Sequence, residues 1–365
     1  MPGPDTCSST HAETRQAGQA RVWRCGVDMV VHREHLLKPP CLVRSFLANN
    51  IRFGSTAFMA QRVGLVGMGL MGQAFIKNMR ERQFIVQGFD VDPARMDQLA
   101  EAGGHPADTP AEAAKGVDRV IVSVPTSDIA RAVIFEDGSG LAAGAEQNLI
   151  VMDTTTARPE DSERTAAELK EMGIRYLDSA VSGTSTMAQA GDLVVIAGGE
   201  KEDFEACREA FAGFSRAAYF MGPSGSGART KLIINLILAG NRLAMAEGML
   251  LGEKAGLDSD NLLSVLQDGA CSSKTMVDKG PKMINADYSQ QGKVAISLKD
   301  SRLMMDMGQK LGAPTMMIQV YAQIMQAALE KGYGQKDTVA FYEIMRGMAG
   351  LEERKGIDDV PFGKD

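Results

Sequence analysis

The sequence predicts an α/β protein with an N-terminal Rossmann-type parallel-sheet domain followed by an all-α C-terminal domain. Short apolar strand candidates alternate with helical segments over residues 61–222, which is typical of βαβ units and a parallel sheet. After residue 222 the strand signal disappears, and long helical segments continue over 223–365. At 365 residues the chain is long enough to bury two cores.

Residues 1–60 differ from both predicted domains. They hold the single Trp and three of the five Cys, and they show no sustained hydrophobic period. A transit peptide is one interpretation. The other is a disordered N-terminal extension, or translated upstream sequence with the working start at Met59.

The elements of the first domain follow one another regularly from Arg62. A β-branched run is followed by glycines and a helix, then by a second strand. Asp92 and Pro93 predict the N-cap and first turn of the next helix. The remaining strand candidates are RVIVSVP (119–125), NLIVMDT (148–154), IRYLDSAV (174–181), LVVIAGG (193–199) and AAYFMG (217–222).

Three long helices are predicted in the second domain, over 227–257, 297–312 and 315–332. The last two carry a methionine stripe at roughly helical spacing, which we interpret as core filler. The stripe consists of Met304, Met305, Met307, Met316 and Met317.

Composition excludes several classes of function. The net charge of −7 argues against nucleic acid as a partner, because phosphate binding needs a basic surface. The most apolar stretch, Leu232–Gly240, is short and carries Asn235, so no membrane span is expected. The five Cys are scattered without a C-x-x-C pair, which predicts free thiols and a cytoplasmic location. No metal site is expected, and no His follows His105.

A G-x-G-x-x-G pattern lies between the first strand and the first helix. Gly67 allows a tight turn, Gly69 lets the backbone approach a pyrophosphate, and Gly72 lets helix and strand pack closely. The helix N-terminus supplies free N–H groups for phosphates. The whole turn, which also includes Met68, Leu70 and Met71, is therefore a candidate dinucleotide site.

Asp90 ends the second strand, eighteen residues after Gly72. A carboxylate at this place can bind both ribose hydroxyls and would repel a 2′-phosphate, which favours NAD over NADP. A purely structural role for Asp90 is the competing interpretation, and Asp92 could take the ribose-binding role instead.

The strand ends of such a sheet form a cleft, and three segments are expected there. Residues 123–128 and 152–159 follow two strands. Residues 178–193 are expected to be a long Ser/Thr/Gly-rich loop that presents hydroxyl and N–H groups to a carboxylate, or an ordinary mobile loop.

Lys231 and Asn235 are four residues apart in an otherwise apolar predicted helix and therefore share a face. Polar side chains in an apolar stretch cost free energy unless they form hydrogen bonds or serve a function. A partly desolvated Lys has a lowered pKa and can act as a general acid or base near neutral pH. Without a usable His, Lys231 is the candidate proton carrier, and a Lys that extends to solvent is the alternative.

Four motifs in order resemble the β-hydroxyacid dehydrogenases, the group of 3-hydroxyisobutyrate dehydrogenase and tartronate semialdehyde reductase. The resemblance covers about residues 62–350. The motifs are VGLVGMGLMG, DSAVSG, GSGARTKLIIN and SLKDSRL.

The resemblance implies a role for several residues. Lys231 would be the catalytic lysine and Asn235 its neighbour, and both would contact the substrate. Lys299 would close over the cofactor, with Asp300 orienting it. Val124, Pro125 and Thr156 would contact the nicotinamide side, with Asp128 a weaker candidate. Ser182, Gly183 and Thr184 would bind the substrate, although Thr184 stands where the family usually has Gly.

The resulting hypothesis is an NAD-dependent oxidoreductase that acts on a small 3-hydroxy acid or its semialdehyde. An imine reductase is a related alternative, which Lys231 and Asp90 both disfavour. A non-catalytic dinucleotide-binding protein is an alternative from another class. The apolar helical domain, together with the resemblance, predicts a homo-oligomer, either a dimer or a tetramer.

Overall fold

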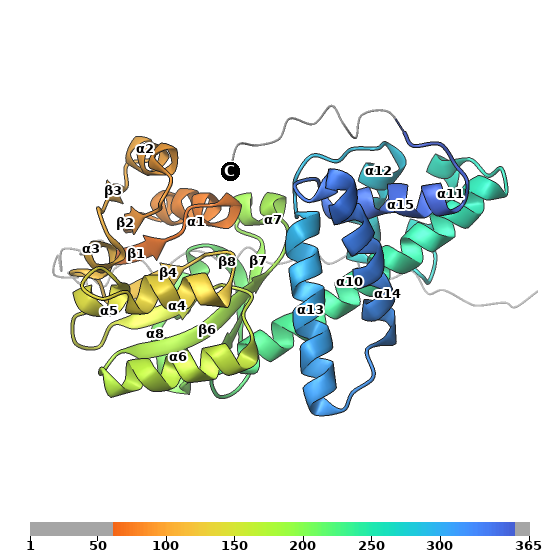
Figure 1. Ribbon diagram of the computed structural model, residues 1–365. Helices are drawn as coiled ribbons and strands as arrows, with labels where there is room; N and C mark the ends of the chain where they lie inside the picture. The colour runs from red at the N-terminus through yellow and green to blue at the C-terminus, as the bar shows by residue number, and fades with distance from the viewer. Residues whose placement is uncertain (1–60, 355–365) are drawn as a thin grey trace, which may run out of the picture. The chain divides into compact units, whose positions relative to one another are not determined.

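The sheet of the computed structural model has eight strands in the order β3-β2-β1-β4-β5-β6-β7-β8 (Figure 1). The structure describes residues 61–354, so the predicted N-terminal extension lies outside the described residues. The strands are β1 (Arg62–Val66), β2 (Ile85–Phe89), β3 (His105–Pro106), β4 (Arg119–Val122), β5 (Ile150–Asp153), β6 (Arg175–Ser182), β7 (Leu193–Gly198) and β8 (Ser215–Phe220).

Every neighbouring pair of strands is parallel except β6 and β7, which pair antiparallel. Only the ten residues 183–192 join these two strands. A parallel return needs a crossover of a dozen residues or more, so this connection reverses the chain direction instead. The predicted Rossmann-type fold class is confirmed, with this one departure from an all-parallel sheet.

The segment expected to be a loop over 178–193 is mostly regular structure, so that expectation was wrong. β6 continues to Ser182, and Ser185–Gln189 form the short helix α7. Thr184 is the N-cap of α7, and its hydroxyl accepts a hydrogen bond from the Met187 N–H at 3.3 Å. Hydroxyl-rich sequence here encodes a helix cap, which the composition alone did not distinguish from a loop.

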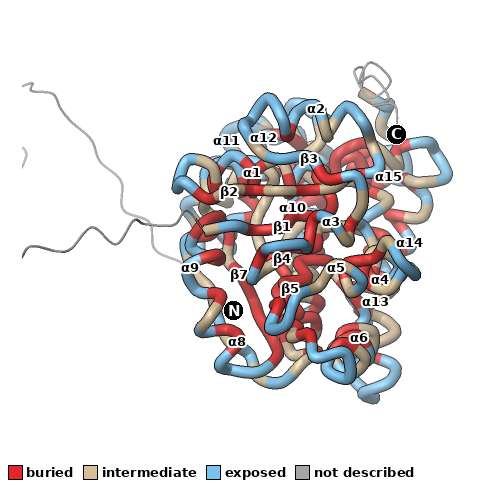
Figure 2. The backbone as a smooth tube through the Cα atoms, turned by 90° about the vertical axis from the view of Figure 1, so that its left-hand side faces the viewer, coloured by how far each residue is buried: buried red, intermediate tan, exposed pale blue. Residues whose placement is uncertain are grey.

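Helices cover both faces of the sheet, whose strands are largely buried (Figure 2). The buried apolar side chains of this region form two separate cores. Val63 and Leu65 pack in one core, while Val66 and Val120 pack in the other. All four residues of β5 are buried, as expected for a strand covered on both sides. The covering helices are α1 (Leu70–Glu81), α2 (Pro93–Glu101), α3 (Pro110–Ala114), α4 (Ser127–Phe135), α5 (Leu141–Gly144), α6 (Pro159–Glu171), α7, α8 (Lys201–Ala206) and α9 (Arg208–Ala212). The predicted Asp92 cap of α2 is confirmed, because its side chain accepts the Ala94 N–H.

Helix α10 (Ser226–Lys254) connects the sheet to the helical part of the chain. The carboxylate of Asp178 on β6 accepts the N–H groups of Gly225 at 3.0 Å and Ala228 at 2.8 Å, which fixes the start of the helix. A Cβ at Gly227 would lie 2.3 Å from the Asp178 carbonyl oxygen, so only glycine allows this close approach. Because α10 packs against β6 and β7 as well as against later helices, the predicted boundary at residues 222 and 223 stays a prediction.

By length and composition, α10 could also cross a membrane. It is nevertheless the central helix of the helical part, where Leu243, Met245 and Met249 are buried in the core. One such helix is weak support for a membrane span.

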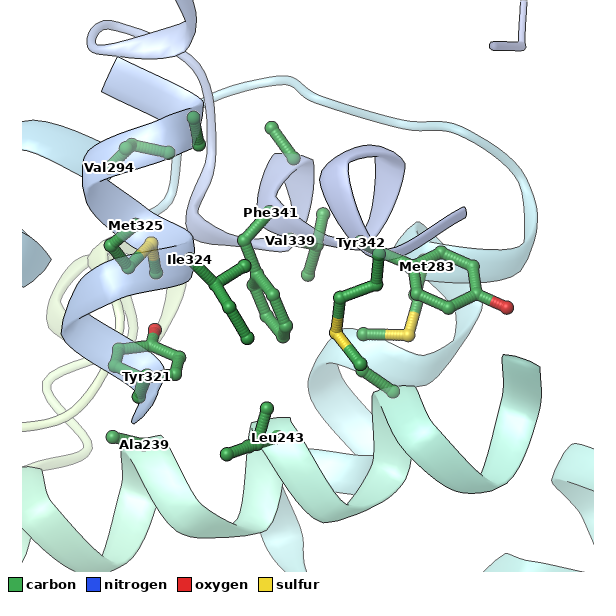
Figure 3. Packing of buried hydrophobic residues seen from close by; sticks show 14 of the residues in the cluster. Ala239, Leu243, Met283, Val294, Tyr321, Ile324, Met325, Val339, Phe341 and Tyr342 are labelled. Atoms are coloured by element: carbon green, nitrogen blue, oxygen red, sulfur yellow. The ribbon is translucent and has the colours of Figure 1, made fainter. Parts of the chain in front are cut away.

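The helical part is built around α10 (Figures 1 and 3). Figure 3 shows Tyr321 and Ile324 gathered with Phe341 over Ala239 and Leu243 of α10. The remaining elements are α11 (Ser259–Asp268), α12 (Lys274–Ile284), α13 (Val294–Leu311), α14 (Met316–Ala328), the π-helical turn η1 (Leu329–Tyr333), the 3-10 turn η2 (Thr338–Ala340) and α15 (Phe341–Met348).

Three of the five methionines in the predicted stripe lie in the core or pack against it. Met304 is buried, and Met305 and Met307 pack against the same cluster. Met316 and Met317 are 75% and 39% exposed. The stripe spans two helices, because α13 ends at Leu311 and Gly312 follows in the left-handed conformation, so its single period is interrupted.

Candidate active site

A cavity of about 950 Å³ lies between the strand ends of the sheet and the facing sides of α10 and α13. This volume suits a small-molecule or cofactor site. Most of the residues singled out from the sequence line it, namely Gly67, Gly69, Leu70, Met71, Asp90, Val124, Pro125, Thr156, Ser182, Gly183, Thr184, Lys231, Asn235, Lys299 and Asp300.

Four of the singled-out residues do not line this cavity. Met68 is buried in the core of the sheet region, and Gly72 packs behind the turn. Asp128 is exposed on α4, with a carboxylate oxygen 3.9 Å from the Arg158 guanidinium. Asp92 is occupied as the cap of α2.

The glycine turn has the geometry that a dinucleotide requires. Gly67 adopts φ +93°, and a Cβ there would lie 2.2 Å from the Ser123 carbonyl oxygen. A Cβ at Gly72 would lie 2.2 Å from the Gly67 carbonyl oxygen. Around Gly69, by contrast, no heavy atom lies within 4 Å of the Cβ position. Two glycines therefore bring the chain close together, and the third leaves backbone open toward the cavity, which fits a pyrophosphate.

Asp90 is 7% exposed at the end of β2, on the wall of the cavity. Its carboxylate accepts the N–H groups of Met68 at 2.5 Å and Asp92 at 2.9 Å. The guanidinium of Arg95 lies 3.4 Å from Asp90 and 3.3 Å from Asp92. The carboxylate is thus held rigidly at the cavity wall, with a cation beside it.

Lys231 and Asn235 project from α10 toward the cavity and are neither fully buried nor exposed. Burial lowers the pKa of Lys231 to about 8, with the charges of Lys299 and Arg242 acting in the same direction and that of Asp300 opposing them. Among the described residues, no hydrogen bond or ion pair engages its ammonium group. A lysine with this pKa can exchange a proton at neutral pH.

Asp300 on α13 connects this helix to Asn235 on α10. Its carboxylate accepts a hydrogen bond from Asn235 at 2.9 Å and pairs with Lys299 at 3.0 Å. Lys299 also donates to the carbonyl oxygens of Pro125 at 3.1 Å and Thr156 at 3.0 Å. The side chain of Lys299 therefore bridges the helical wall and the loops after β4 and β5.

The segment Ser182–Gly183–Thr184 forms the end of β6 and the entry to α7 at the cavity wall. Gly183 adopts φ +146°, a backbone conformation that other residues rarely take. Its Cβ position lies 2.5 Å from a Leu193 methyl group, so the turn packs tightly against β7.

Sequence reasoning missed several charged residues that line the same cavity. Arg242 is the clearest, because Lys231, Asn235, Leu238 and Arg242 continue one helical face at steps of four, three and four residues. Extending that spacing by two turns would have found it. Lys279 on α12 is buried and pairs with Asp337 at 2.8 Å, a long-range pair that no spacing in the sequence indicates.

Among residues 61–354, no group of three or more His, Cys, Asp or Glu side chains is placed to hold a metal ion.

A glycine turn at the edge of a Rossmann-type sheet, facing a lysine on a long helix, defines the class of NAD(P)-dependent dehydrogenases and reductases. Residues 62–222 match the NAD binding domain of 6-phosphogluconate dehydrogenase. Residues 225–345 match the domain described as the NAD-binding domain of NADP-dependent 3-hydroxyisobutyrate dehydrogenase. The chain belongs to the β-hydroxyacid dehydrogenase family, whose members are NAD(P)-dependent 3-hydroxyacid dehydrogenases and reductases.

Named relatives match the chain over most of their length. Glyoxylate/succinic semialdehyde reductase 1 of Arabidopsis thaliana is 29% identical over 78% of this chain and 98% of that protein. L-threonate dehydrogenase of Cupriavidus necator is 29% identical over 80% of this chain and 98% of that protein. The crystal structure of a 3-hydroxyisobutyrate dehydrogenase from Salmonella typhimurium has a TM-score of 0.72 at 26% identity, covering 78% of this chain and 99% of the other.

Proposed function

We propose that this chain is an NAD-dependent oxidoreductase that transfers hydride between a small 3-hydroxy acid and its semialdehyde. The substrate would be similar to 3-hydroxyisobutyrate or tartronate semialdehyde. The observation that carries the proposal is one cavity with the open glycine turn on one wall and Lys231, with its lowered pKa, on the other.

Each residue of the site has a distinct part in this proposal. The hydroxyl and N–H groups of Ser182, Gly183 and Thr184 bind the substrate carboxylate. Asn235, held by Asp300, positions the hydroxyl group beside Lys231. Neutral Lys231 then takes the hydroxyl proton when the alcohol is oxidised, and it returns this proton when the carbonyl is reduced.

The nicotinamide group, when bound, accepts the hydride from the hydroxyl-bearing carbon. The open backbone at Gly69, with Leu70 and Met71, would hold the pyrophosphate at the start of α1. Pro125 and Thr156 lie beside Lys299, and Val124 lines the same cavity, which supports their placement on the nicotinamide side.

We propose NAD rather than NADP as the cofactor because the Asp90 carboxylate, on the cavity wall at the end of β2, would bind the ribose hydroxyls and repel a 2′-phosphate. Asp90→Asn removes the charge and keeps only one of the two hydrogen bonds from Met68 and Asp92, because an amide has a single acceptor oxygen. Arg95 beside it can then pair with a 2′-phosphate. We expect the ratio of kcat/KM for NADP to that for NAD to rise about tenfold in this variant. An unchanged ratio would place the ribose elsewhere.

A spectrophotometric panel tests the reaction itself. NAD and NADP are each combined with C2-substituted 3-hydroxypropanoates, and the reduced cofactors with the matching semialdehydes and with cyclic imines. Turnover of the hydroxy acids with NAD supports the proposal. Turnover of imines alone would favour an imine reductase, and silence across the panel with cofactor binding intact would favour a non-catalytic dinucleotide-binding protein.

We also propose a homo-oligomer, a dimer or a tetramer, assembled through the helical part. Helices α10 and α14 pack together, and both leave large apolar side chains exposed. Ile233 and Ile237 on α10 are 52% and 54% exposed, and Val320 on α14 is 48% exposed. Light scattering of the wild type and of Ile237→Lys would test this, with a smaller mass expected for the variant.

A cytoplasmic location completes the proposal, and it rests on the scattered free thiols. Fractionation of cells that express the full chain would test it.

A further inference from the structure

Arg242 lies on the face of α10 that carries Lys231 and Asn235, and it lines the same cavity. Its Nε donates to the Leu238 carbonyl oxygen at 3.1 Å, and its guanidinium lies 5.7 Å from the centre of the Tyr321 ring. The Tyr321 hydroxyl in turn is 3.2 Å from Ser297 Oγ on α13. The guanidinium is therefore oriented by its own helix and by Tyr321 on α14, which Ser297 on α13 helps to position.

No carboxylate among the described residues pairs with Arg242, whereas the other two arginines of the cavity are paired. Arg216 lies 3.0 Å from Asp192, and Arg95 lies beside Asp90 and Asp92. Arg242 is half-buried, and among the described residues only its Nε forms a hydrogen bond. Its terminal N–H groups remain available for an anion.

The charges near Arg242 also favour an anion as its binding partner. The Arg242 charge contributes to the lowered pKa of both Lys231 and Lys279, so the guanidinium lies within electrostatic reach of each. Lys279 is itself neutralised by Asp337. A partly desolvated cation without a counterion is costly, and a bound anionic group would offset that cost.

The position of Arg242 along α10 also gives its approximate distance from Asn235, at the reacting end of the site. Seven residues separate it from Asn235, which is a rise of about 10 Å along α10. The bond to the Leu238 carbonyl oxygen turns the side chain back toward the helix N-terminus. The guanidinium therefore lies about one turn, roughly 5 Å, beyond Asn235. In the proposed function Asn235 holds the substrate hydroxyl, so this rise corresponds to three or four bonds from the hydroxyl-bearing carbon.

We propose that the substrate carries a second anionic group, a carboxylate or a phosphonate, and that Arg242 binds it. Attached through a methylene group at C2 of a 3-hydroxypropanoate, this anion reaches Arg242 while the first carboxylate lies at Ser182–Gly183. The proposal rests on the proposed function and makes its substrate class narrower.

Matched substrates test the preference directly. Three 3-hydroxypropanoates are compared that carry a methyl, a carboxymethyl or a phosphonomethyl group at C2. We expect kcat/KM of the wild type to be at least about tenfold higher for one of the dianionic substrates than for the methyl substrate. Arg242→Gln should abolish this difference, and Arg242→Lys should retain part of it. Because the Arg242 charge also lowers the pKa of Lys231, the variants are compared at a pH above the rising limb, where Lys231 is neutral in each of them. The better of the two dianionic substrates identifies the anion.

Arg302→Gln is the matched control, because Arg302 lies on α13, its side chain bonds only to Gln326 among the described residues, and it does not line the cavity. It should leave every substrate unaffected. An equal loss on the methyl and dianionic substrates in Arg242→Gln would mean that Arg242 binds the first carboxylate, which overturns the proposal. The proposal would also be overturned if the wild type showed no preference for the dianionic substrates over the methyl substrate.

A binding measurement separates this inference from the proposed reaction. With NAD present, the midpoint of thermal unfolding is followed against butanoate, butanedioate and 3-phosphonopropanoate. A dianion should stabilise the wild type at about tenfold lower concentration than butanoate, and this advantage should disappear in Arg242→Gln but not in Arg302→Gln. If the substrate panel is silent while this pattern holds, the reaction is wrong and the anion site stands. If hydroxy acids turn over and the pattern is absent, the anion site is wrong and the reaction stands.

Discussion

The two walls of the cavity recognise ligands by different means. The sheet wall presents backbone, with the open turn at Gly69 at the N-terminus of α1. The helical wall presents charged and polar side chains from α10 and α13. Backbone N–H groups suit the pyrophosphate that dinucleotides share, whereas side chains can carry a proton and distinguish substrates. We therefore expect substitutions on the two walls to separate cofactor binding from chemistry.

Lys231→Ala should give the largest effect. It removes the proposed proton carrier, so turnover should fall about a thousandfold or more, while the Kd for NAD should change by less than about threefold. Steady-state kinetics and fluorescence titration of the cofactor measure the two quantities. Lys254→Ala, at the exposed end of the same helix, is the control and should keep full activity. Near-normal turnover of the Lys231 variant would remove Lys231 from the mechanism.

Two alanine substitutions in the glycine turn sharpen the comparison on the sheet wall. Gly72→Ala places a methyl group 2.2 Å from the Gly67 carbonyl oxygen, so we expect a loss of about 2–4 kcal/mol in the free energy of unfolding. Gly69→Ala meets no atom within 4 Å and should cost less than about 1 kcal/mol.

Gly69→Ala should nevertheless weaken NAD binding about tenfold, because its methyl group occupies the approach of the pyrophosphate. Denaturant unfolding and cofactor titration of both variants distinguish packing from binding. Equal stability of the two variants would contradict the contact at Gly72, and unchanged NAD affinity in Gly69→Ala would contradict the proposed pyrophosphate site.

The sheet wall could be predicted from the sequence to a large extent because its signals are local. The spacing of Gly67, Gly69 and Gly72, with an acid at the next strand end, is complete within one βαβ unit. The antiparallel β7 was not predicted, since an apolar strand reads the same in either direction. The cap at Thr184 was also missed, because hydroxyl-rich sequence is typical of loops and helix caps alike.

The helical wall was less predictable because its contacts join distant parts of the chain. The spacing of Lys231 and Asn235 indicated a shared face, but Asp300, which binds Asn235, is sixty-five residues away. Only the family resemblance pointed to Lys299 and Asp300. Arg242 was within reach of the helical period and was overlooked, because an arginine in a helix is usually a solvated side chain.

The smallest expected effect is a pH shift that tests whether the charges of the helical wall act on Lys231. Its pKa of about 8 means that the neutral base is scarce at low pH. For alcohol oxidation, kcat/KM should therefore rise about tenfold per pH unit below 8 and level off above it, whereas kcat/KM for carbonyl reduction should decline above 8.

The Asp300 charge raises the pKa of Lys231 and the Lys299 charge lowers it. Asp300→Asn should thus move the rising limb to lower pH and Lys299→Met should move it to higher pH, each by about half a unit. Shifts in the same direction would mean that the limb reports another group, and no shift in either variant would mean that solvent screens Lys231 from both neighbours.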